Sequence, residues 1–258
     1  MLPLTRREFI GTVAAGFVVS KDYPVHQPKV EVLWKSPDGH PNALEATKEG
    51  LWVGEQVTDN AYLLDWRNGQ VLRKVPTESS NTSGIAYGGG FLWMAANGKS
   101  LWRNPKSTDA TDGRVLKIDP RTGTTLERYP VPGGGGVHGL VWAEDSLWIT
   151  SLSLKSLTQV DVNFKTMRSV PVPLDRAHGL AWDNGSIWCV FTNDYQILRL
   201  ETKNGRILEA IELKKGSDPD PHGMDRYEGA FYYCDAGIGT KGIDNGSKHA
   251  GYICRFYL

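Results

Sequence analysis

The stretch HGLVWAEDSLWITS, which runs from His138 to Ser151, decides the fold because four related stretches recur along the chain. These are NALEATKEGLWVGE from Asn42, SGIAYGGGFLWMAA from Ser83, HGLAWDNGSIWCVF from His178 and HGMDRYEGAFYYCD from His222. Each stretch carries an aromatic anchor ten positions after its first residue, and the anchors are Trp52, Trp93, Trp148, Trp188 and Tyr232. Successive anchors are 41, 55, 40 and 44 residues apart. A repeat of roughly 40 to 50 residues is typical of one four-stranded propeller blade.

The residues between the anchors favour strands over helices. In the third repeat, alternating and β-branched residues predict strands over residues 140–143, 147–150, 157–162 and 167–172. Tight turns between the third and fourth strands are indicated by Asn68-Gly69, Thr122-Gly123 and Asn204-Gly205, where glycine can take a positive φ. An open sandwich of similar strand count is the alternative fold, but it would need a different spacing.

The two ends of the repeat region set the number of blades. The last repeat runs out after a third strand at Tyr252–Tyr257, whereas an unassigned strand at Val30–Lys35 precedes the first repeat. We therefore predict that the N-terminal strand completes the last blade. The prediction is an all-β fold: a single five-bladed propeller over residues 28–258, whose closed ring leaves no long free edge.

Composition excludes several classes of protein. The 258 residues include 29 Lys+Arg and 29 Asp+Glu, so the net charge of zero offers no electrostatic attraction for nucleic acid. With 40% hydrophobic residues the chain can bury a large core, which excludes intrinsic disorder. No apolar run reaches the roughly 18 residues that span a bilayer. We expect a monomer whose partner is a small molecule, with no membrane contact apart from an uncleaved signal segment.

The N-terminus looks like an export signal. Residues Thr5–Phe9 read TRREF, and the next residues, Ile10–Ser20, are uncharged and mostly apolar or small. This pattern is typical of a twin-arginine signal, so we assign residues 1–27 to a signal segment and expect a periplasmic or secreted protein. The alternative is an ordinary tail that happens to contain Arg6 and Arg7. Because no clean cleavage site follows, the cut between Ala15 and Val25 stays open.

Three cysteines are too few for a disulfide framework, and none has the spacing of a redox or zinc motif. Cys234 and Cys254 fall on adjacent predicted strands of the last blade. In an oxidising compartment these two could pair, whereas Cys189 should stay free.

Propeller topology predicts where a site would form. The residue just before each inner strand should ring the mouth of the central channel, and these residues are Asn42, Ser83, His138, His178 and His222. The second strands end at the same mouth, three residues past the anchors, at Glu55, Ala96, Ser151, Phe191 and Asp235. In this second set only Glu55 and Asp235 can ionise. We expect His138, His178, Asn42 and Ser83 to bind substrate.

The closure places the last blade beside the first, so His222, Asp235 and Glu55 should lie together. Imidazole beside carboxylate suits general acid/base catalysis, and these three are our predicted catalytic residues. The same groups could hold a divalent cation, Mg²⁺ or Ca²⁺, and no organic cofactor is indicated. The alternative is that His-Gly is an architectural turn element of the repeat.

Two insertions, Asn97–Gly113 and Ala236–Ala250, fall on the face that carries this mouth. Long loops on a rigid scaffold often carry binding sites. We expect Trp102 to stack on a ligand. The cationic side chains in the insertions would meet an acidic group of the ligand; they are Arg103, Lys106, Lys241, Lys248 and His249. The alternative is a pair of solvated loops without a ligand.

Two motifs resemble a known family. PHGM at residues 221–224 and LWVGE at residues 51–55 are similar to the PHGI and LWFTE blade motifs of streptogramin B lyases. The resemblance implies a propeller that opens a cyclic substrate by metal-assisted β-elimination, with two histidines and two glutamates around a magnesium ion. His222 and Glu55 are the residues here that match those motifs. Five-bladed glutaminyl cyclotransferases and gluconolactonase-type propellers are similar in architecture.

These observations predict an exported small-molecule hydrolase or lyase with an acid/base or metal-assisted site at the channel mouth. Two alternatives stay open: a glutaminyl cyclotransferase-like enzyme, and a propeller that binds a ligand or a protein without catalysis.

Overall fold

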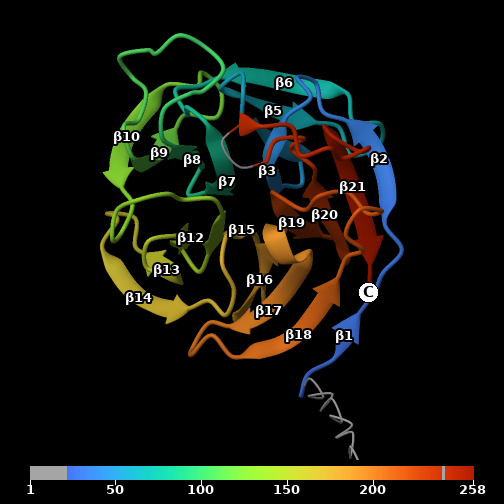
Figure 1. The fold of residues 1–258 in the computed structure, drawn as a ribbon. Coiled ribbons are helices and arrows are strands. Elements are labelled where there is room, and N and C mark those ends of the chain that lie inside the picture. The colour runs from blue at the N-terminus through green and yellow to red at the C-terminus, as the bar shows by residue number, and fades with distance from the viewer. Residues whose placement is uncertain (1–21, 240–241) are drawn as a thin grey trace, which may run out of the picture.

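A computed structural model of the chain describes residues 22–239 and 242–258, and Figure 1 shows them as a ring of five β-sheets. The described residues contain 21 strands and one short 3₁₀ helix, η1 (Thr192–Asp194). Within these ranges no helix is long and apolar enough to cross a membrane. Arg6 and Arg7 of the predicted signal lie outside the described residues.

Each sheet is one blade with antiparallel neighbours, numbered outward from the channel. Blade one contains β3 (Pro41–Ala46), β4 (Leu51–Glu55), β5 (Asn60–Leu64) and β6 (Val71–Pro76). Blade two contains β7 (Thr82–Gly88), β8 (Phe91–Asn97), β9 (Gly113–Ile118) and β10 (Thr125–Pro130). Blade three contains β11 (Leu140–Ala143), β12 (Ser146–Ser151), β13 (Ser156–Val160) and β14 (Thr166–Pro171). Blade four contains β15 (Ala177–Asp183), β16 (Ser186–Phe191), β17 (Gln196–Glu201) and β18 (Ile207–Glu212). Blade five contains β19 (Met224–Tyr227), β20 (Ala230–Cys234), β21 (Tyr252–Tyr257) and β2 (Glu31–Lys35).

The five-bladed, all-β fold is therefore confirmed, and so is its closure. In Figure 1 the N-terminal strand β2 lies along the C-terminal strand β21. The two strands pair antiparallel, from Glu31 opposite Arg255 to Lys35 opposite Tyr252. The guanidinium of Arg255 also forms an ion pair with the Glu31 carboxylate at 2.6 Å. The outer strand of the last blade thus comes from the other end of the chain.

One strand lies inside the segment that the sequence assigned to the signal. Strand β1 (Val25–His26) runs parallel to β18, with Val25 opposite Ala210, and adds a fifth strand to blade four. The Ala210 N–H donates to the Pro24 carbonyl at 2.9 Å. The outer edge of β18 offers such backbone groups, and the segment before residue 28 satisfies them. The sheet structure therefore begins before the expected boundary.

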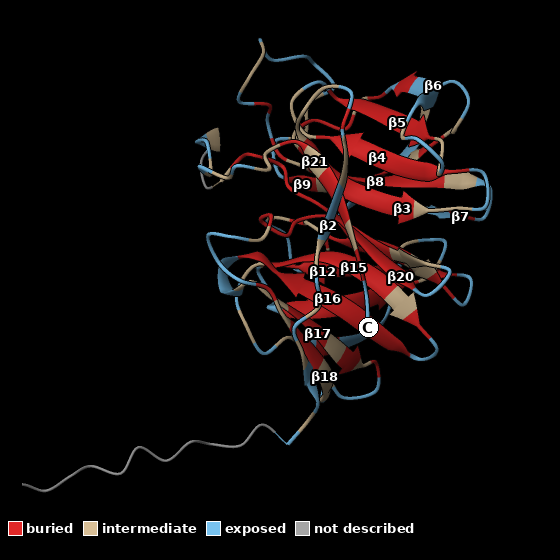
Figure 2. Cartoon of the chain, turned by 90° about the vertical axis from the view of Figure 1, so that its right-hand side faces the viewer, coloured by how far each residue is buried: buried red, intermediate tan, exposed pale blue. Residues whose placement is uncertain are grey.

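The hydrophobic core lies between blades. Five clusters of buried apolar residues each join two neighbouring sheets, and Figure 2 shows the strands as mostly buried. Trp188 of blade four, for example, contacts Phe231 of blade five edge to face, with ring centroids 5.1 Å apart. The tryptophan anchors are at most 2% exposed, which explains why the repeat needs a large aromatic residue there.

The predicted pairing of Cys234 with Cys254 is wrong, because the register offsets the two residues by one position. Cys234 stands opposite Ile253, and Cys254 stands opposite Tyr233. Neighbouring positions on a strand point to opposite faces. Cys234 therefore joins the core shared with blade one and Cys254 the core shared with blade four. All three cysteines are buried and free.

Candidate functional site

The repeated His-Gly pair has an architectural half. A Cβ atom added at Gly139 would lie 1.9 Å from the carbonyl oxygen of His178, and one at Gly223 would lie 2.4 Å from the Cα of Ala43. The inner strands therefore approach so closely that their second residue must be small. The central channel is nearly closed as a result, with a volume of about 10 Å³. Any ligand must bind at a mouth of the ring and not along its axis.

The histidine of the pair is different, because the three imidazoles meet. The rings of His138 and His178 are 4.5 Å apart between centroids, and those of His178 and His222 are 5.1 Å apart, both edge to face. His178 and His222 are 1% exposed. The structure thus brings together three of the five predicted ring residues through their side chains.

The other two ring residues are committed to the backbone. The Ser83 hydroxyl donates to the Val137 carbonyl, and the Asn42 amide donates to the Thr82 carbonyl at 3.0 Å. Both side chains therefore tie one inner strand to the loop of the next blade. Asn42 keeps one buried oxygen, Oδ1, without a hydrogen-bond partner.

The two predicted carboxylates occupy equivalent positions and make equivalent contacts. Asp235 accepts the Asp220 main-chain N–H at 2.9 Å, and Glu55 accepts the His40 main-chain N–H at 2.9 Å. In each blade the donor precedes the ring residue by two positions. Both carboxylates are fully buried, so they were wrongly expected to be peripheral groups of little consequence for stability. Each one holds the loop that leads into its inner strand.

Glu55 does not join the histidine cluster. Its other hydrogen bond comes from the Ser36 hydroxyl, on the loop between β2 and β3. Burial raises its pKa to about 7, although the Ser36 and His40 hydrogen bonds oppose that shift. Among the residues that the structure describes, the group with ligand atoms within 4.8 Å of one another consists of Asp220, His222 and Asp235. The expected partnership of Glu55 with His222 and Asp235 is thus replaced by one with Asp220.

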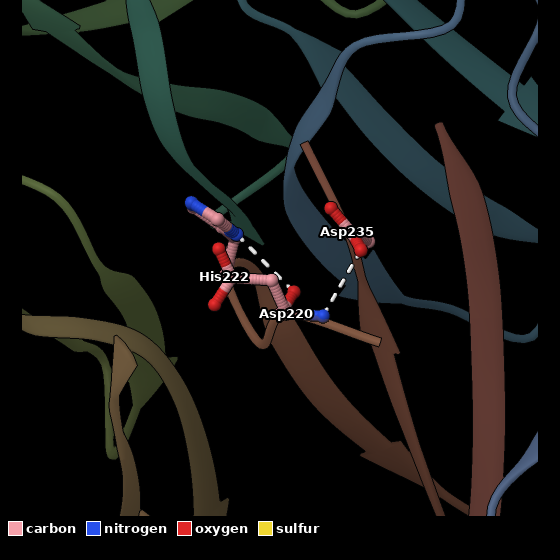
Figure 3. Close-up of side chains that lie close together, drawn as sticks. All are labelled: Asp220, His222 and Asp235. Carbon is pink, nitrogen blue, oxygen red and sulfur yellow. Dashed lines mark hydrogen bonds between the residues drawn. The ribbon is translucent and has the colours of Figure 1, made fainter. Parts of the chain in front are cut away.

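Asp220 is the residue that the sequence reasoning missed. Figure 3 shows it linked to both partners: its main-chain N–H donates to Asp235, and its main-chain carbonyl lies 3.2 Å from Nδ1 of His222. Its carboxylate accepts the Asn245 amide at 2.9 Å. The stretch DPDP at residues 218–221, directly before His222, was the available signal.

The Asp220 carbonyl determines which nitrogen of His222 can react. If Nδ1 donates to that carbonyl, Nε2 carries the lone pair, and Nε2 is buried without a hydrogen-bond partner. Burial lowers the pKa of His222, but the negative charges of Asp220 and Asp235 oppose that shift. For His178 the pKa is lowered well below its usual value by burial and then by its histidine neighbours, with no carboxylate to oppose it. His222 is therefore the most basic of the three by environment.

His138 has a fixed orientation. Its Nε2 lies 3.0 Å from the amide nitrogen of Asn97, so this imidazole nitrogen accepts a hydrogen bond. Burial, Arg176 and His222 together lower its pKa to about 3. The ring is therefore neutral at physiological pH, and its Nδ1–H has no partner.

A cavity of about 330 Å³ opens beside His138. Both insertions contribute to it, through Leu101 and Trp102 from one and Gly239 and Gly242 from the other. Its remaining lining residues are Gln56, Asn81, Asn97, Leu152 and Arg176. Trp102 is thus placed where the sequence predicted a ligand contact. A larger groove of about 790 Å³ lies at the far end of β3, and no residue of the ring lines it.

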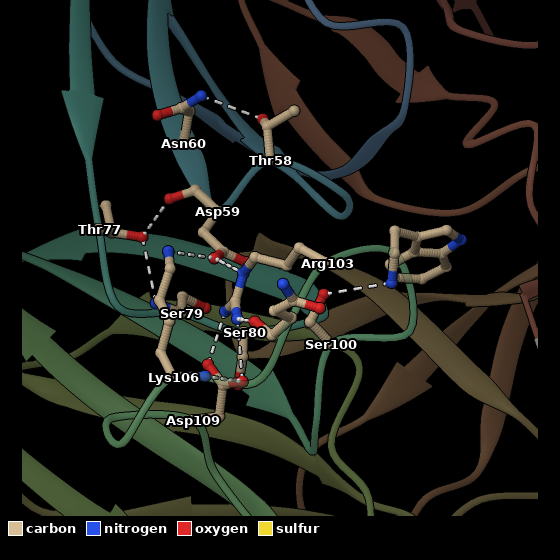
Figure 4. Close-up of polar contacts among 12 residues, drawn as sticks. Thr58, Asp59, Asn60, Thr77, Ser79, Ser80, Ser100, Arg103, Lys106 and Asp109 are labelled. Atoms are coloured by element: carbon tan, nitrogen blue, oxygen red, sulfur yellow. Dashed lines mark hydrogen bonds and ion pairs between the residues drawn. The ribbon is translucent and has the colours of Figure 1, made fainter.

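The predicted role of Arg103 and Lys106 is wrong. Figure 4 shows both side chains turned to carboxylates of the protein itself. Arg103 pairs with Asp59 and with Asp109, each at 2.6 Å, and Lys106 pairs with Asp59 at 3.1 Å. These cations hold the first insertion on blade one and do not face the cavity. Lys241 lies outside the described residues, and Lys248 and His249 are not among the cavity lining.

The residues fit a divalent cation only in part. Two carboxylates and an imidazole are suitable ligand types. However, Asp235 already accepts three N–H donors, from Asp220, Gly237 and Asn245. A cation bound by all three residues would have to displace at least one of these donors.

Comparison with known proteins supports the fold. A glutaminyl cyclase from Myxococcus xanthus is similar in structure with a TM-score of 0.66 and 14% sequence identity, over 91% of this chain and 98% of that one. A streptogramin B lyase structure has a TM-score of 0.53 and 16% identity, over 90% and 98% of the two chains. A PQQ-bound aldose sugar dehydrogenase from Streptomyces coelicolor has a TM-score of 0.56 and 12% identity, over 91% and 99%. No protein-family model and no curated protein matches the sequence. At these identities the likeness shows the propeller fold, including its similarity to streptogramin B lyase.

Proposed function

We propose that this protein is an enzyme that acts on a small molecule at the channel mouth, with His222 as the general base. The observation that supports this most is the buried, unpartnered Nε2 of His222 in a group with two carboxylates. A buried polar atom without a partner is costly in a purely structural role. A substrate proton would satisfy it.

His138 has a different part in this proposal. Its Nε2 lone pair is used by Asn97, so it cannot accept a substrate proton. It lines the cavity and offers Nδ1–H as a hydrogen-bond donor. The substrate would rest on His138, and its reacting group would extend past this ring to reach His222.

The chemistry that fits is hydrolysis or elimination. In hydrolysis His222 Nε2 takes a proton from water as the oxygen attacks a carbonyl, and it then returns the proton to the leaving group. In elimination it takes a proton from carbon, and the leaving group departs with the bonding electrons. Asp220 stabilises the imidazolium in either case.

A cyclotransferase is the second candidate, favoured by the higher TM-score of the glutaminyl cyclase. There an amine of the substrate attacks its own side-chain amide and ammonia leaves. The same base could carry the proton from the amine to the ammonia.

Mass spectrometry separates these reactions. Purified protein is incubated with cyclic depsipeptides, lactones and peptides that begin with glutamine. Hydrolysis adds the mass of one water, ring-opening elimination leaves the mass unchanged, and cyclisation removes the mass of ammonia. His222→Gln should abolish turnover, whereas His26→Gln, on the outer strand β1, should retain it. If every class stays unchanged, or if His222→Gln keeps full activity, the proposal fails and a binding role is favoured.

The divalent cation remains a proposal, and no step above requires it. Asp220 and His222 would hold it, and it would supply a Lewis acid. Addition of Mg²⁺ or Ca²⁺ should then raise the melting temperature of the wild type, and the rise should be lost in Asp220→Asn. No shift in the wild type would remove the cation.

Export is likewise proposed. Replacement of Arg6 and Arg7 by lysine should keep the folded protein in the cytoplasm, as cell fractionation would show. Unchanged export of that variant would contradict a twin-arginine route.

A further inference from the structure

Arg176 is a half-buried cation on the wall of the mouth cavity. Its guanidinium donates one hydrogen bond, to the Asn193 amide oxygen at 3.1 Å. Within the described residues, no carboxylate oxygen lies within 4.0 Å of it. Its backbone also has a φ of 54°, a left-handed value that is uncommon for a residue with a side chain. The loop holds a charge at the cavity without an ion-pair partner.

Asp220 attracts Arg176 only from a greater distance. Burial lowers the pKa of Arg176, and the charge of Asp220 partly offsets this. The Asp220 carboxylate is itself engaged by the Asn245 amide and by the Tyr195 hydroxyl. An arginine that loses water without gaining a close anion is unfavourable in a structural role. The arrangement becomes favourable once an anion enters the cavity.

A chain of amides crosses the opposite wall of the cavity in one direction. Gln56 donates to Asn81 at 2.9 Å, and Asn81 donates to the Asn97 carbonyl at 3.3 Å. Asn97 then contacts His138 at 3.0 Å. Each amide nitrogen is used, so the first member is left with a free acceptor. That acceptor, Oε1 of Gln56, is buried and has no partner.

The same cavity thus contains an unpaired cation and an unpaired acceptor. Both lie beside the indole of Trp102 and the apolar side chains of Leu101 and Leu152. A molecule that satisfies them needs an anionic group for Arg176, an N–H or O–H donor for Gln56 and an apolar or planar part for Trp102. One cation with Asp220 nearby favours a single negative charge over the double charge of a phosphate.

We propose that the mouth cavity binds small carboxylic acids that also carry an N–H or O–H group, such as N-acyl amino acids, with Arg176 as the carboxylate anchor. The inference rests on the proposed function in that both use the same mouth. It concerns binding, however, and not turnover.

Calorimetry with matched probes tests it. The probes are N-acetyl and N-benzoyl amino acids, each compared with its carboxamide, which has the same shape and no charge. The wild type should bind the carboxylates about 10- to 100-fold more tightly than the carboxamides, the range expected for a charge-assisted hydrogen bond. Arg176→Gln should lose this preference, and Arg176→Lys should keep part of it. Arg206→Gln is the matched control, because Arg206 is an exposed arginine on the turn between β17 and β18, and it should keep the full preference.

Stability provides a second measurement. Because Arg176 has no close anion, Arg176→Gln should not lower the melting temperature, so a loss of preference cannot come from misfolding. The inference is overturned if no probe binds, if carboxylates and carboxamides bind equally, or if the preference survives in Arg176→Gln. Carboxylate binding without any turnover would contradict the enzyme proposal and leave this inference intact.

Discussion

The main-chain N–H of Asp220 donates to the carboxylate of Asp235 across the base of blade five, at 2.9 Å. One blade on, His40 and Glu55 repeat the contact. A single structural solution therefore explains both carboxylates that the repeat places at the mouth. It also sets the Asp220 carbonyl against His222, so the position of the proposed base depends on Asp235 without direct contact between their side chains.

Asp235→Asn should therefore reduce both stability and activity. An amide cannot accept all three N–H donors, because one of its two polar atoms is itself a donor. We expect a loss of about 2 to 4 kcal/mol in the free energy of unfolding, measured by urea denaturation. Asp244→Asn, an exposed aspartate on the same insertion, is the control and should unfold as the wild type does. A stable Asp235→Asn protein would argue against the positioning role.

Glu55 makes stability depend on pH. Its pKa is 4.5 in the unfolded chain and about 7 in the folded protein, so folding takes up a proton between these values. The contribution of Glu55 to stability is therefore highest below pH 4.5, declines as the pH rises towards 7 and is constant above it. The decline amounts to about 3 kcal/mol.

Glu55→Gln should lack this part of the decline when unfolding is followed at several pH values. The exposed Glu49 on the same blade provides the control, and Glu49→Gln should retain the wild-type profile. Parallel profiles for wild type and Glu55→Gln would show that the Glu55 pKa is not raised.

The close approach of the inner strands predicts a severe effect of one methyl group. Gly139→Ala would place a Cβ atom 1.9 Å from a main-chain oxygen, which cannot move aside as a side chain could. We expect a loss of roughly 3 kcal/mol or more, or an insoluble protein. Gly239→Ala meets its nearest atom at 3.5 Å and should be nearly neutral in the same thermal melt. Equal melting temperatures would mean that the inner strands can separate.

The ion-pair group that fixes the first insertion can be broken at one residue. Asp59 accepts from both Arg103 and Lys106, and its carboxylate is 2% exposed. Asp59→Asn should raise the amide hydrogen exchange of residues 98–112 and lower stability by about 3 kcal/mol, as expected for a buried pair that loses one partner. Asp112→Asn, on the same loop and exposed, should leave the exchange unchanged. Unaltered exchange in Asp59→Asn would show that other contacts hold the loop.

The fold could be predicted because its signals are local and repeated. The spacing of Trp52, Trp93, Trp148 and Trp188 gives the blade, and a missing strand in the last repeat gives the closure, without any side-chain geometry. The strand β1 could not be found in this way, since two residues carry no periodicity and pair only with a backbone edge.

The candidate site was predictable only as far as topology reaches. Repeat position brought His138, His178 and His222 together, but the choice of partners depends on side-chain direction. Glu55 points to the loop between β2 and β3, and Asp220 reaches His222 from outside the repeat. Likewise, a strand offset of one residue separates Cys234 from Cys254, and sequence spacing does not reveal such an offset.

The pairing of β2 with β21 also has a consequence for how the protein is made. Glu31 and Arg255 are 224 positions apart, so this pairing joins nearly the first described strand to the last. On the ribosome, β2 emerges early and stays without its partner until almost the whole chain has been synthesised. The final step of folding is therefore the docking of the oldest strand onto the newest, a contact with a high cost in loop-closure entropy. Until then the open side of blade five is exposed, and the nascent chain is most vulnerable to intermolecular strand exchange in this interval.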